Sequence, residues 1–317
     1  MPVFNQHTLT GLDFKRLLDR RKAVAKKHEH PRLGTYRLIE EIACQAPDEC
    51  YHAWPPGKSG WASPLFLRTF PREVFSLGLR DWLQRYVDVA EQGIETIFRL
   101  EFVGDRGLIA SEYIFGASLA DLGRVLVESR RSLSWVMALA LFSVVLARLM
   151  RLHGRGIGHG RITPRLIRLT VDGEVWLCRG LPHAISDFAT QPAPLEPSLS
   201  AAQRNGDLVA LGRAILPLAG GERASQVAEL FDGRDRQAFA VLSDLIIERD
   251  PAISDLVVGV LWPLSDPASE LSTINADILA TRTLAQVSPS EVRQLLEMVA
   301  RGSPDFHQGH RALGVAI

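Results

Sequence analysis

One long apolar segment, residues 133–150, constrains the fold of this chain more than any other feature. Between Trp135 and Ala147 only Ser143 interrupts the apolar side chains. This uninterrupted part is about 13 residues long, well short of the roughly 20 that span a bilayer. The segment therefore predicts a buried helix inside a globular core, around which the other elements of the chain must pack.

The composition is typical of a soluble domain. The chain has 317 residues, 46% of them hydrophobic and 23% charged, which is enough to bury one substantial core or two lobes. Its formal net charge of zero gives no general attraction to nucleic acid or to an anionic membrane. Three cysteines without a Cys-x-x-Cys pair indicate a reducing compartment and no structural zinc. The N-terminus is too polar for a secretory signal peptide, so we expect a cytoplasmic protein without a membrane span.

The stretch that follows the apolar segment, residues 156–167 (GIGHGRITPRLI), resembles the catalytic loop of protein kinases. That loop reads His-Arg-Asp-Leu-Lys-Pro-x-Asn, in which the aspartate orients and deprotonates the attacking hydroxyl and the asparagine holds magnesium. His159 keeps its place, but Arg161 and Leu166 replace the aspartate and the asparagine. Arginine offers no hydrogen-bond acceptor and leucine has no lone pair for a metal, so neither can perform the original role.

Two segments further upstream resemble kinase strands and stand in the order expected from the loop. Residues 36–42 and 50–53 resemble the first two kinase strands, and the three glycines expected between them are replaced by Ala43, Gln45 and Asp48. Glycine is needed there because bare backbone N–H groups must approach the phosphates closely. Side chains prevent that approach and Asp48 adds repulsion, so we do not expect this loop to hold phosphate.

The third kinase strand also has replaced residues in this sequence. Residues 65–68 (LFLR) stand where kinases have Val-Ala-x-Lys, whose lysine binds two phosphates. Arg68 keeps the charge but not the compact ammonium geometry. Phe66 replaces the small residue that lies against the adenine, so we expect its ring to fill the nucleotide's place. Residues 110–119 then resemble the hinge that leads into the lower lobe.

Downstream of the loop, residues 172–178 predict a hairpin turn and a strand that place Arg179 where the Asp of Asp-Phe-Gly belongs. Two unit charges about 4 Å apart interact with roughly 4 kcal/mol at an effective dielectric constant near 20, so Mg²⁺ facing Arg179 would be disfavoured by about twice that. Millimolar binding corresponds to only about 4 kcal/mol. Ordinary magnesium affinity should therefore be lost.

The structural anchors of the family are better preserved. Residues 207–216 resemble the buried helix that anchors the lower lobe, and the resemblance implies that Asp207 is a structural residue that binds backbone N–H groups of the catalytic loop. Residues 262–270 resemble the Asp-Pro-x-x-Arg corner, with Glu270 in place of the arginine. That arginine normally pairs with the glutamate of an Ala-Pro-Glu motif, of which residues 194–196 resemble a remnant. Two glutamates cannot form this ion pair.

Seven landmarks in kinase order make residues 34–285 similar to the bacterial Ser/Thr protein kinases, as a degenerate member. The resemblance implies an α+β, two-lobed fold with a small β-rich upper lobe and a larger helical lower lobe. We expect four regions: a basic N-terminal extension (1–33), an N-lobe (34–113), a C-lobe (114–285), and a C-terminal helical extension and tail (286–317). Residues 1–33 carry eight Lys or Arg against three acidic residues, which suits either a solvated helix or a docking arm for an acidic partner.

The degenerate positions predict a pseudokinase, an inactive domain with no catalytic residue, cofactor or metal. We expect it to act in bacterial signalling as a regulatory or scaffold module. Its expected partner is a protein: an active kinase, a phosphatase, or a component of a signalling or secretion assembly.

Alternatives to this function rest on the same residues. One is an atypical kinase-fold protein that binds nucleotide or another anion differently and keeps residual phosphotransferase activity, with a carboxylate supplied by Asp172, Asp187 or Glu196. Another is a site for an anion or a phosphopeptide, formed by Arg68, Arg161 and Arg179. In the simpler interpretation these arginines pair with internal carboxylates such as Asp48 or Glu91.

A rival ancestry also fits the loop, because His159-Gly160 matches the His-Gly-Asp loop of aminoglycoside and choline phosphotransferases. Those enzymes too require the aspartate that Arg161 replaces. The first-strand pattern and the spacing of Asp207 and Gly212 favour protein-kinase descent.

Overall fold

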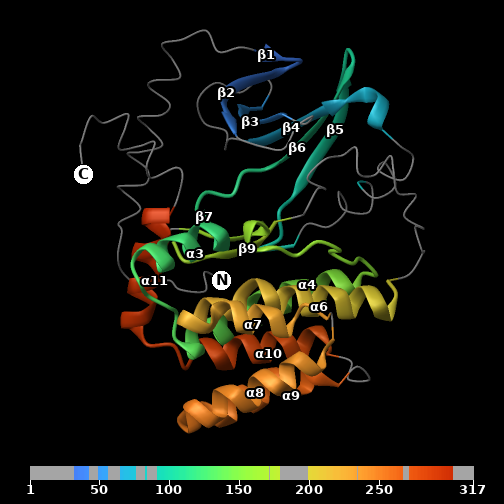
Figure 1. Cartoon of the computed structure of the whole chain (residues 1–317). Coiled ribbons are helices and arrows are strands. Elements are labelled where there is room, and N and C mark those ends of the chain that lie inside the picture. Colours follow the sequence, from blue (N-terminus) through green and yellow to red (C-terminus); the bar gives the residue numbers. More distant parts are fainter. Residues whose placement is uncertain are drawn as a thin grey trace. The chain divides into compact units, whose positions relative to one another are not determined.

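The computed structural model describes two compact units, one rich in strands and one mostly helical (Figure 1). The strand-rich unit ends at Ile114 and the helical unit begins at Phe115. The structure describes residues 32–42, 49–55, 65–75, 83, 91–170, 172–178, 199–233, 235–266 and 271–302. The predicted basic extension thus lies outside the described residues except for its last two positions.

Six antiparallel strands form the sheet of the strand-rich unit, in the order β1-β2-β3-β4-β6-β5 (Figure 1). They are β1 (Arg32–Leu33), β2 (Tyr36–Ile42), β3 (Glu49–Trp54), β4 (Leu65–Pro71), β5 (Ile97–Val103) and β6 (Arg106–Glu112), with a short 3-10 helix, η1 (Arg72–Val74), after β4. Val103 pairs with Arg106, so β5 and β6 are joined by a two-residue turn. Gly104 in this turn has φ +62°, a left-handed conformation that glycine adopts without strain.

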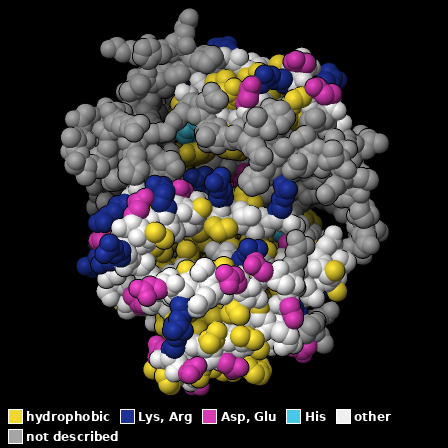
Figure 2. All heavy atoms as spheres, viewed as in Figure 1, with side chains coloured by type: hydrophobic (Ala, Val, Ile, Leu, Met, Phe, Trp, Pro, Cys, Tyr) yellow, Lys and Arg dark blue, Asp and Glu magenta, His cyan; other side chains and the backbone are white. Residues whose placement is uncertain are grey.

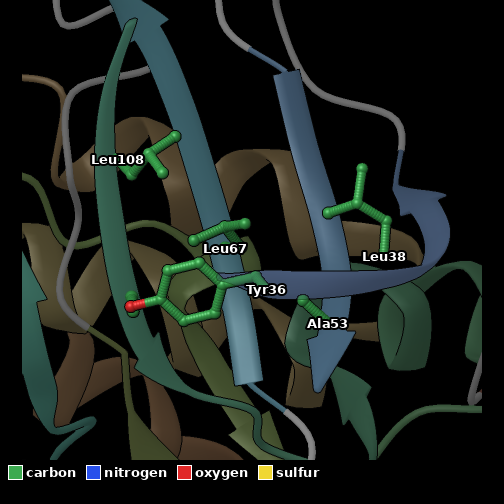
Figure 3. Packing of buried hydrophobic residues seen from close by; sticks show 6 residues of the cluster. Tyr36, Leu38, Ala53, Leu67 and Leu108 are labelled. Carbon is green, nitrogen blue, oxygen red and sulfur yellow. The ribbon is translucent and has the colours of Figure 1, made fainter. Parts of the chain in front are cut away.

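The core of this unit lies on one face of the sheet (Figure 3). Successive side chains of a strand point to opposite faces, so every second residue reaches this core. The buried cluster consists of Tyr36, Leu38, Ala53, Leu67, Leu108 and Ala110. The residues between them, His52, Phe66 and Arg68, therefore point to the opposite face.

Helices make up most of the second unit (Figure 1). They are α3 (Leu119–Glu128), α4 (Trp135–Gly154), α6 (Ala201–Ile215), α7 (Ala224–Leu230), α8 (Gln237–Arg249), α9 (Ser254–Ser265), α10 (Thr273–Leu284) and α11 (Pro289–Gly302), with short 3-10 helices that include η2 (Pro164–Leu166), η3 (Leu216–Ala219) and η4 (Gly221–Arg223). Together with the sheet of the first unit they give the α+β fold, with a small β-rich part and a larger helical part, that the sequence predicts.

Helix α4 is the core of the helical unit. It is long and apolar enough to span a membrane, but 83% of its most apolar window is buried within the protein. It packs against α6 and α10, and its Phe142 ring lies 5.9 Å from that of Phe239. The buried helix predicted for residues 133–150 is therefore present.

One charged side chain lies inside this core. Arg148 is buried on α4, and its Nε donates a hydrogen bond of 2.9 Å to the carbonyl oxygen of Val175. Burial lowers the pKa of the guanidinium to about 10, with a smaller contribution from Arg151. The group thus stays charged at neutral pH and ties α4 to the adjacent strand.

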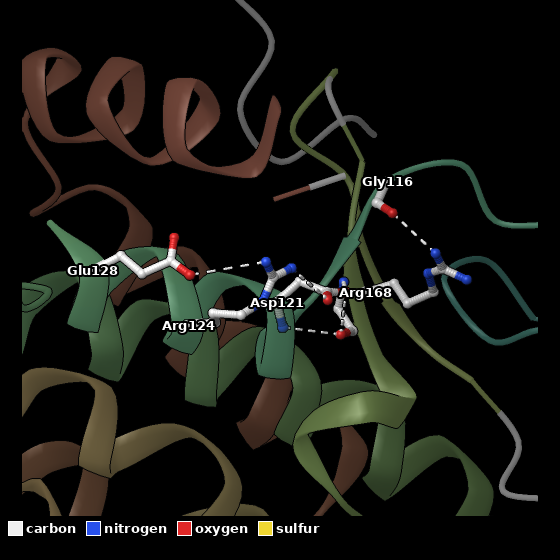
Figure 4. Close-up of polar contacts among 6 residues, drawn as sticks. Gly116, Asp121, Arg124, Glu128 and Arg168 are labelled. Atoms are coloured by element: carbon white, nitrogen blue, oxygen red, sulfur yellow. Dashed lines mark hydrogen bonds and ion pairs between the residues drawn. The ribbon is translucent and has the colours of Figure 1, made fainter. Parts of the chain in front are cut away.

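A three-stranded sheet in the order β7-β8-β9 borders the helices; its strands are β7 (Ala117–Ser118), β8 (Ile167–Leu169) and β9 (Val175–Leu177). Arg168 Nη2 donates to the carbonyl oxygen of Gly116 at 2.9 Å (Figure 4). Ser118 begins α3 as its N-cap and exchanges hydrogen bonds with Asp121, which also pairs with Arg124 (Figure 4). These contacts fix the strand that begins the helical unit and the helix that follows it.

Candidate functional site

A buried carboxylate organises the loop that follows α4. Asp207 lies on α6 with only 2% of its surface exposed. Its Oδ2 accepts a hydrogen bond of 2.8 Å from the backbone N–H of His159, and its Oδ1 accepts one of 2.7 Å from that of Gly160. The two donors are consecutive residues, and the next residue of the loop is Arg161.

The same carboxylate also binds the end of α4. His153 Nε2 lies 2.9 Å from Asp207 Oδ2, and both side chains are buried. Because an ionised carboxylate only accepts hydrogen bonds, His153 Nε2 is the donor. Asp207 therefore connects three parts of the helical unit: α6, the last turn of α4, and the loop.

His159 joins the loop to β9 from the other side. Its ring is buried, and its Nε2 lies 2.9 Å from the carbonyl oxygen of Cys178, to which it must donate. The backbone N–H of Cys178 in turn donates to the carbonyl oxygen of Leu166 at 2.7 Å. The loop is thus held at both its beginning and its end by hydrogen bonds that involve no exposed side chain.

The two side chains that the sequence singles out on this loop, Arg161 and Leu166, make none of the hydrogen bonds described above. Arg161 is exposed. Leu166 is half-buried at the end of η2, where its backbone N–H donates to Thr163. Neither side chain has an oxygen atom that could accept a proton or bind a cation.

The strand-rich unit has a second group of candidate residues on the sheet face opposite its core. Cross-strand pairing places His52, Phe66 and Ser111 in one row across β3, β4 and β6. Arg68 lies two residues further along β4 and is buried, whereas Phe66 is half-buried. The ring of His52 stacks on that of Tyr113, with centroids 3.9 Å apart. Three rings therefore gather at this end of the face.

Ser111, the last residue of this row, makes a buried polar contact. Ser111 Oγ donates a hydrogen bond of 2.6 Å to Oε1 of Glu95, and both residues are buried. Glu95 follows a short turn before β5, so it reaches the face from outside the paired strands. This part of the sheet face thus combines aromatic rings with the carboxylate of Glu95. The basic side chain of Arg68 lies two residues further along β4.

No protein-family model matches the chain, and no curated protein matches its sequence. Solved structures do match. The kinase domain of Mycobacterium tuberculosis PknI is 16% identical over 81% of this chain and 99% of that domain, with a TM-score of 0.52. A single-mutant form of the same domain is 18% identical over 80% and 98% of the two chains, with a TM-score of 0.53. This chain has a protein-kinase-like fold. The two-lobed kinase-like fold predicted from the sequence is confirmed.

Within the kinase-like fold, the Asp207 network lies in the helical unit and the ring-bearing face in the strand-rich unit. Arg68 and Arg161 thus belong to different units, and Arg179 is outside the described residues, as are Ala43, Gln45 and Asp48. The predicted three-arginine anion site stays a prediction. Of the alternative carboxylates, Asp187 and Glu196 are also outside the described part, while the side chain of Asp172 accepts from Thr170 in the turn before β9.

No resident metal site appears in the described part of the kinase-like fold, where no three His, Cys, Asp or Glu side chains lie close enough together to hold an ion. The absence of metal and cofactor nevertheless stays a prediction, because Arg179 and residues 43–48 lie outside the ranges described.

Two structural residues of this fold escaped the sequence analysis. His153 contacts Asp207, and the only sequence signal for it is a polar residue at the end of a long apolar helix. Arg236 is buried and donates to the carbonyl oxygen of Leu264 and to Asn205 Oδ1, which links α9 and α6 to the start of α8. Its partners are distant in sequence, so no local pattern identifies it.

Proposed function

We propose that this chain is a catalytically inactive kinase-like domain, a pseudokinase, that acts by binding another protein. One observation carries the proposal. Asp207 holds the backbone N–H groups of His159 and Gly160, and the residue directly after this pair is Arg161, where the resemblance puts the catalytic aspartate. The register therefore rests on two hydrogen bonds to a buried carboxylate as well as on sequence similarity. Arginine at this position cannot accept the proton of an attacking hydroxyl.

The remaining degenerate positions support the same conclusion. Leu166 offers no metal ligand, and Arg179, by the resemblance, stands where a magnesium-binding aspartate is expected. On the strand-rich unit, Phe66 belongs to a cluster of three rings in the part of the sheet that the resemblance assigns to adenine. A domain that keeps the fold while losing the base, the metal ligands and the phosphate-binding glycines is suited to recognition rather than to phosphoryl transfer.

Nucleotide binding tests the inactive state directly. A ligand at 100 times its dissociation constant stabilises the folded protein by about 2.7 kcal/mol, which is easily measured as a rise in melting temperature. We expect no rise with millimolar ATP or ADP and magnesium, compared with the same nucleotide and EDTA. An active bacterial kinase domain serves as the positive control. A clear magnesium-dependent rise would contradict the proposal.

For the partner we infer a bacterial, cytoplasmic signalling context, in which an active kinase, a phosphatase or a component of a larger assembly is bound. Affinity purification of the full chain from its native host, followed by mass spectrometry, gives candidates. Each candidate is then purified and tested for a one-to-one complex by calorimetry. If no purified candidate binds, the scaffold role is wrong even where catalysis is absent.

A further inference from the structure

A small groove on the helical unit lies between α7 and α8, away from the Asp207 network. Its floor and walls are mostly apolar, and its volume is about 120 Å³. The side chains that line it are Trp135, Arg223, Gln226, Val227, Leu230, Leu242, Leu245, Ile246 and Arg249, with Gly220 from the end of η3. In Figure 2 hydrophobic side chains are exposed over the lower helices, with charged side chains among them.

The spacing of the lining residues shows that two helix faces form this groove. On the η4–α7 segment they stand at positions 223, 226, 227 and 230, and on α8 at 242, 245, 246 and 249. Both sets follow the i, i+3, i+4, i+7 pattern of a single helical face. Val241, one turn before Leu245 on α8, is also exposed, so the apolar surface continues beyond the groove. Such a surface suits a second helix laid against it.

The charged side chains that line the groove are both positive. Arg223 and Arg249 line it, whereas no carboxylate does. The acidic residues of the same helices, such as Glu229, Asp244 and Glu248, fall outside the two lining rows. Among the residues that the structure describes, neither arginine takes part in an ion pair. An occupant with carboxylates beside its apolar group would complement these two guanidinium groups.

The volume of the groove indicates whether its occupant is a single apolar side chain or a lipid. A cavity of about 150 Å³ holds one benzene molecule. A volume of about 120 Å³ is smaller than that, so it suits one side chain of about the size of leucine better than a whole acyl chain of a lipid. The lining also includes Trp135, Arg223 and Arg249, and tryptophan and arginine are the residue types enriched among those that dominate binding energy at protein interfaces.

We propose that the groove between α7 and α8 binds an acidic amphipathic helix of a partner protein, with one bulky apolar side chain in the pocket and carboxylates facing Arg223 and Arg249. This inference rests on the proposed function, in that the chain works by binding protein, and it names the chemistry of one partner segment. Leu245 and Val241 contact the apolar face of the bound helix next to the anchor.

A synthetic peptide tests the proposal on the full chain. The probe is an alanine-based helix of roughly 16 residues, long enough to populate helix in water, with a central leucine and a glutamate one turn to either side. A second peptide carries lysines instead of the glutamates, and a third has alanine at the anchor position. Binding is measured by fluorescence anisotropy, and the bound surface is located by methyl NMR at Val227, Leu230, Leu242, Leu245 and Ile246.

We expect the acidic leucine peptide to bind at least about tenfold more tightly than either of the other two, and more weakly as salt is raised. Leu245→Asp and Arg249→Glu should each weaken its binding about tenfold, and Arg249→Glu should improve binding of the lysine peptide. Val258→Asp is the matched control for the first variant, because Val258 is 44% exposed on α9 and Leu245 is 41% exposed, yet only Leu245 lines the groove. Arg282→Glu on α10 is the control for the second. Each variant is first checked for an unchanged melting temperature.

Several results would overturn the proposal. Equal binding of acidic and basic peptides would remove the role of the arginines, and methyl shifts away from the five lining residues would locate the site elsewhere. Displacement of the peptide by dodecanoate at lower concentration would indicate a lipid, and a dimer broken by Leu245→Asp would indicate a second copy of the chain. None of these results alters the nucleotide test, so failure of the groove proposal is distinguishable from failure of the proposed function.

Discussion

By the resemblance to kinases, the loop after α4 and the ring-bearing sheet face both carry replacements of catalytic or nucleotide-binding residues, but the replacements lie in different surroundings. On the loop, the replaced side chain of Arg161 is exposed and Leu166 is half-buried, while buried hydrogen bonds to Asp207 and Cys178 hold the backbone. On the sheet, the replacements are packed into the unit itself: Arg68 is buried and Phe66 sits beside His52. Catalytic residues on the loop can thus be exchanged without disturbing its architecture, whereas exchange on the sheet changes packing.

The largest expected effect concerns the buried carboxylate of the loop. Asp207→Ala should lower the free energy of unfolding by about 3 kcal/mol or more, because it leaves two buried donors and one part-buried donor without an acceptor, and each buried donor is worth roughly 1 to 3 kcal/mol. Arg161→Ala should change it by less than about 0.5 kcal/mol, as exposed residues usually do. Urea unfolding measures both.

Should Asp207→Ala not fold, Asp207→Asn provides the comparison, since it keeps one acceptor oxygen and should lose less stability. Equal losses for Asp207→Ala and Arg161→Ala would mean that hydrogen bonds to Asp207 do not hold the loop backbone in the way described above.

The second prediction concerns nucleotide binding and separates the two regions. The variant with Arg161→Asp, Leu166→Asn and Arg179→Asp regains the base and the metal ligands, yet we expect no binding of Mg-ATP, since positioned groups act only on a substrate that is held in place. Binding should appear after Phe66→Ala, Arg68→Lys and glycines at 43, 45 and 48 are added. Calorimetry across the series is the measurement, and each variant is first checked for folding.

Phe66 is only half-buried, so Phe66→Ala should destabilise the protein by less than the roughly 3 to 5 kcal/mol of a fully buried phenylalanine. If the triple variant alone binds Mg-ATP tightly, the sheet face does not obstruct the nucleotide and the distinction between the two regions fails.

A smaller effect tests the loop backbone. Gly160 has φ +76°, and an added Cβ would meet no atom within 4 Å, so Gly160→Ala should cost about 1 kcal/mol from the backbone conformation alone. Gly206 on α6 also has open space around it but lacks a positive φ, so Gly206→Ala should stabilise by roughly 0.5 to 1 kcal/mol. Thermal unfolding distinguishes the two signs; destabilisation by both would point to packing instead.

The smallest effect is on the surface of the sheet. Hydrogen bonding to Arg106 holds the pKa of Glu49 below its ordinary value of 4.5. A lowered carboxyl pKa contributes stability above the ordinary value, and this stability is lost as the pH falls through the folded-state pKa. The two side chains are 36% and 40% exposed, so solvent screening limits the contribution to about 1 kcal/mol or less.

Glu49→Gln should therefore destabilise slightly at pH 7 and show no difference from the parent chain near pH 3, as measured by urea unfolding at both pH values. Glu128→Gln, at a more exposed site on α3, is the control. A pH-independent effect of Glu49→Gln would show that packing, not the ion pair, is responsible.

Much of the fold could be predicted because its signals are local. The buried helix α4 follows from an apolar run too short for a membrane, and the landmarks from the first strand to Asp207 follow from spacing along the chain. The buried residues that support the loop and the helices around it could not be predicted. His153 and Arg236 find their partners 54 and 28 residues away, through contacts that exist only once helices have packed.

By itself, the sequence determined the chemistry available at positions 161 and 166, since arginine and leucine lack a side-chain oxygen atom in any conformation. The resemblance of its motifs to those of kinases also implied the α+β fold, because each motif can be identified from a few neighbouring residues. The tertiary structure alone decided that Asp207 also binds His153 and so connects α6 to the end of α4. It also decided that two helical faces with Arg223 and Arg249 enclose an apolar groove. Those features depend on distances between residues remote in sequence, which are set by how the helices pack.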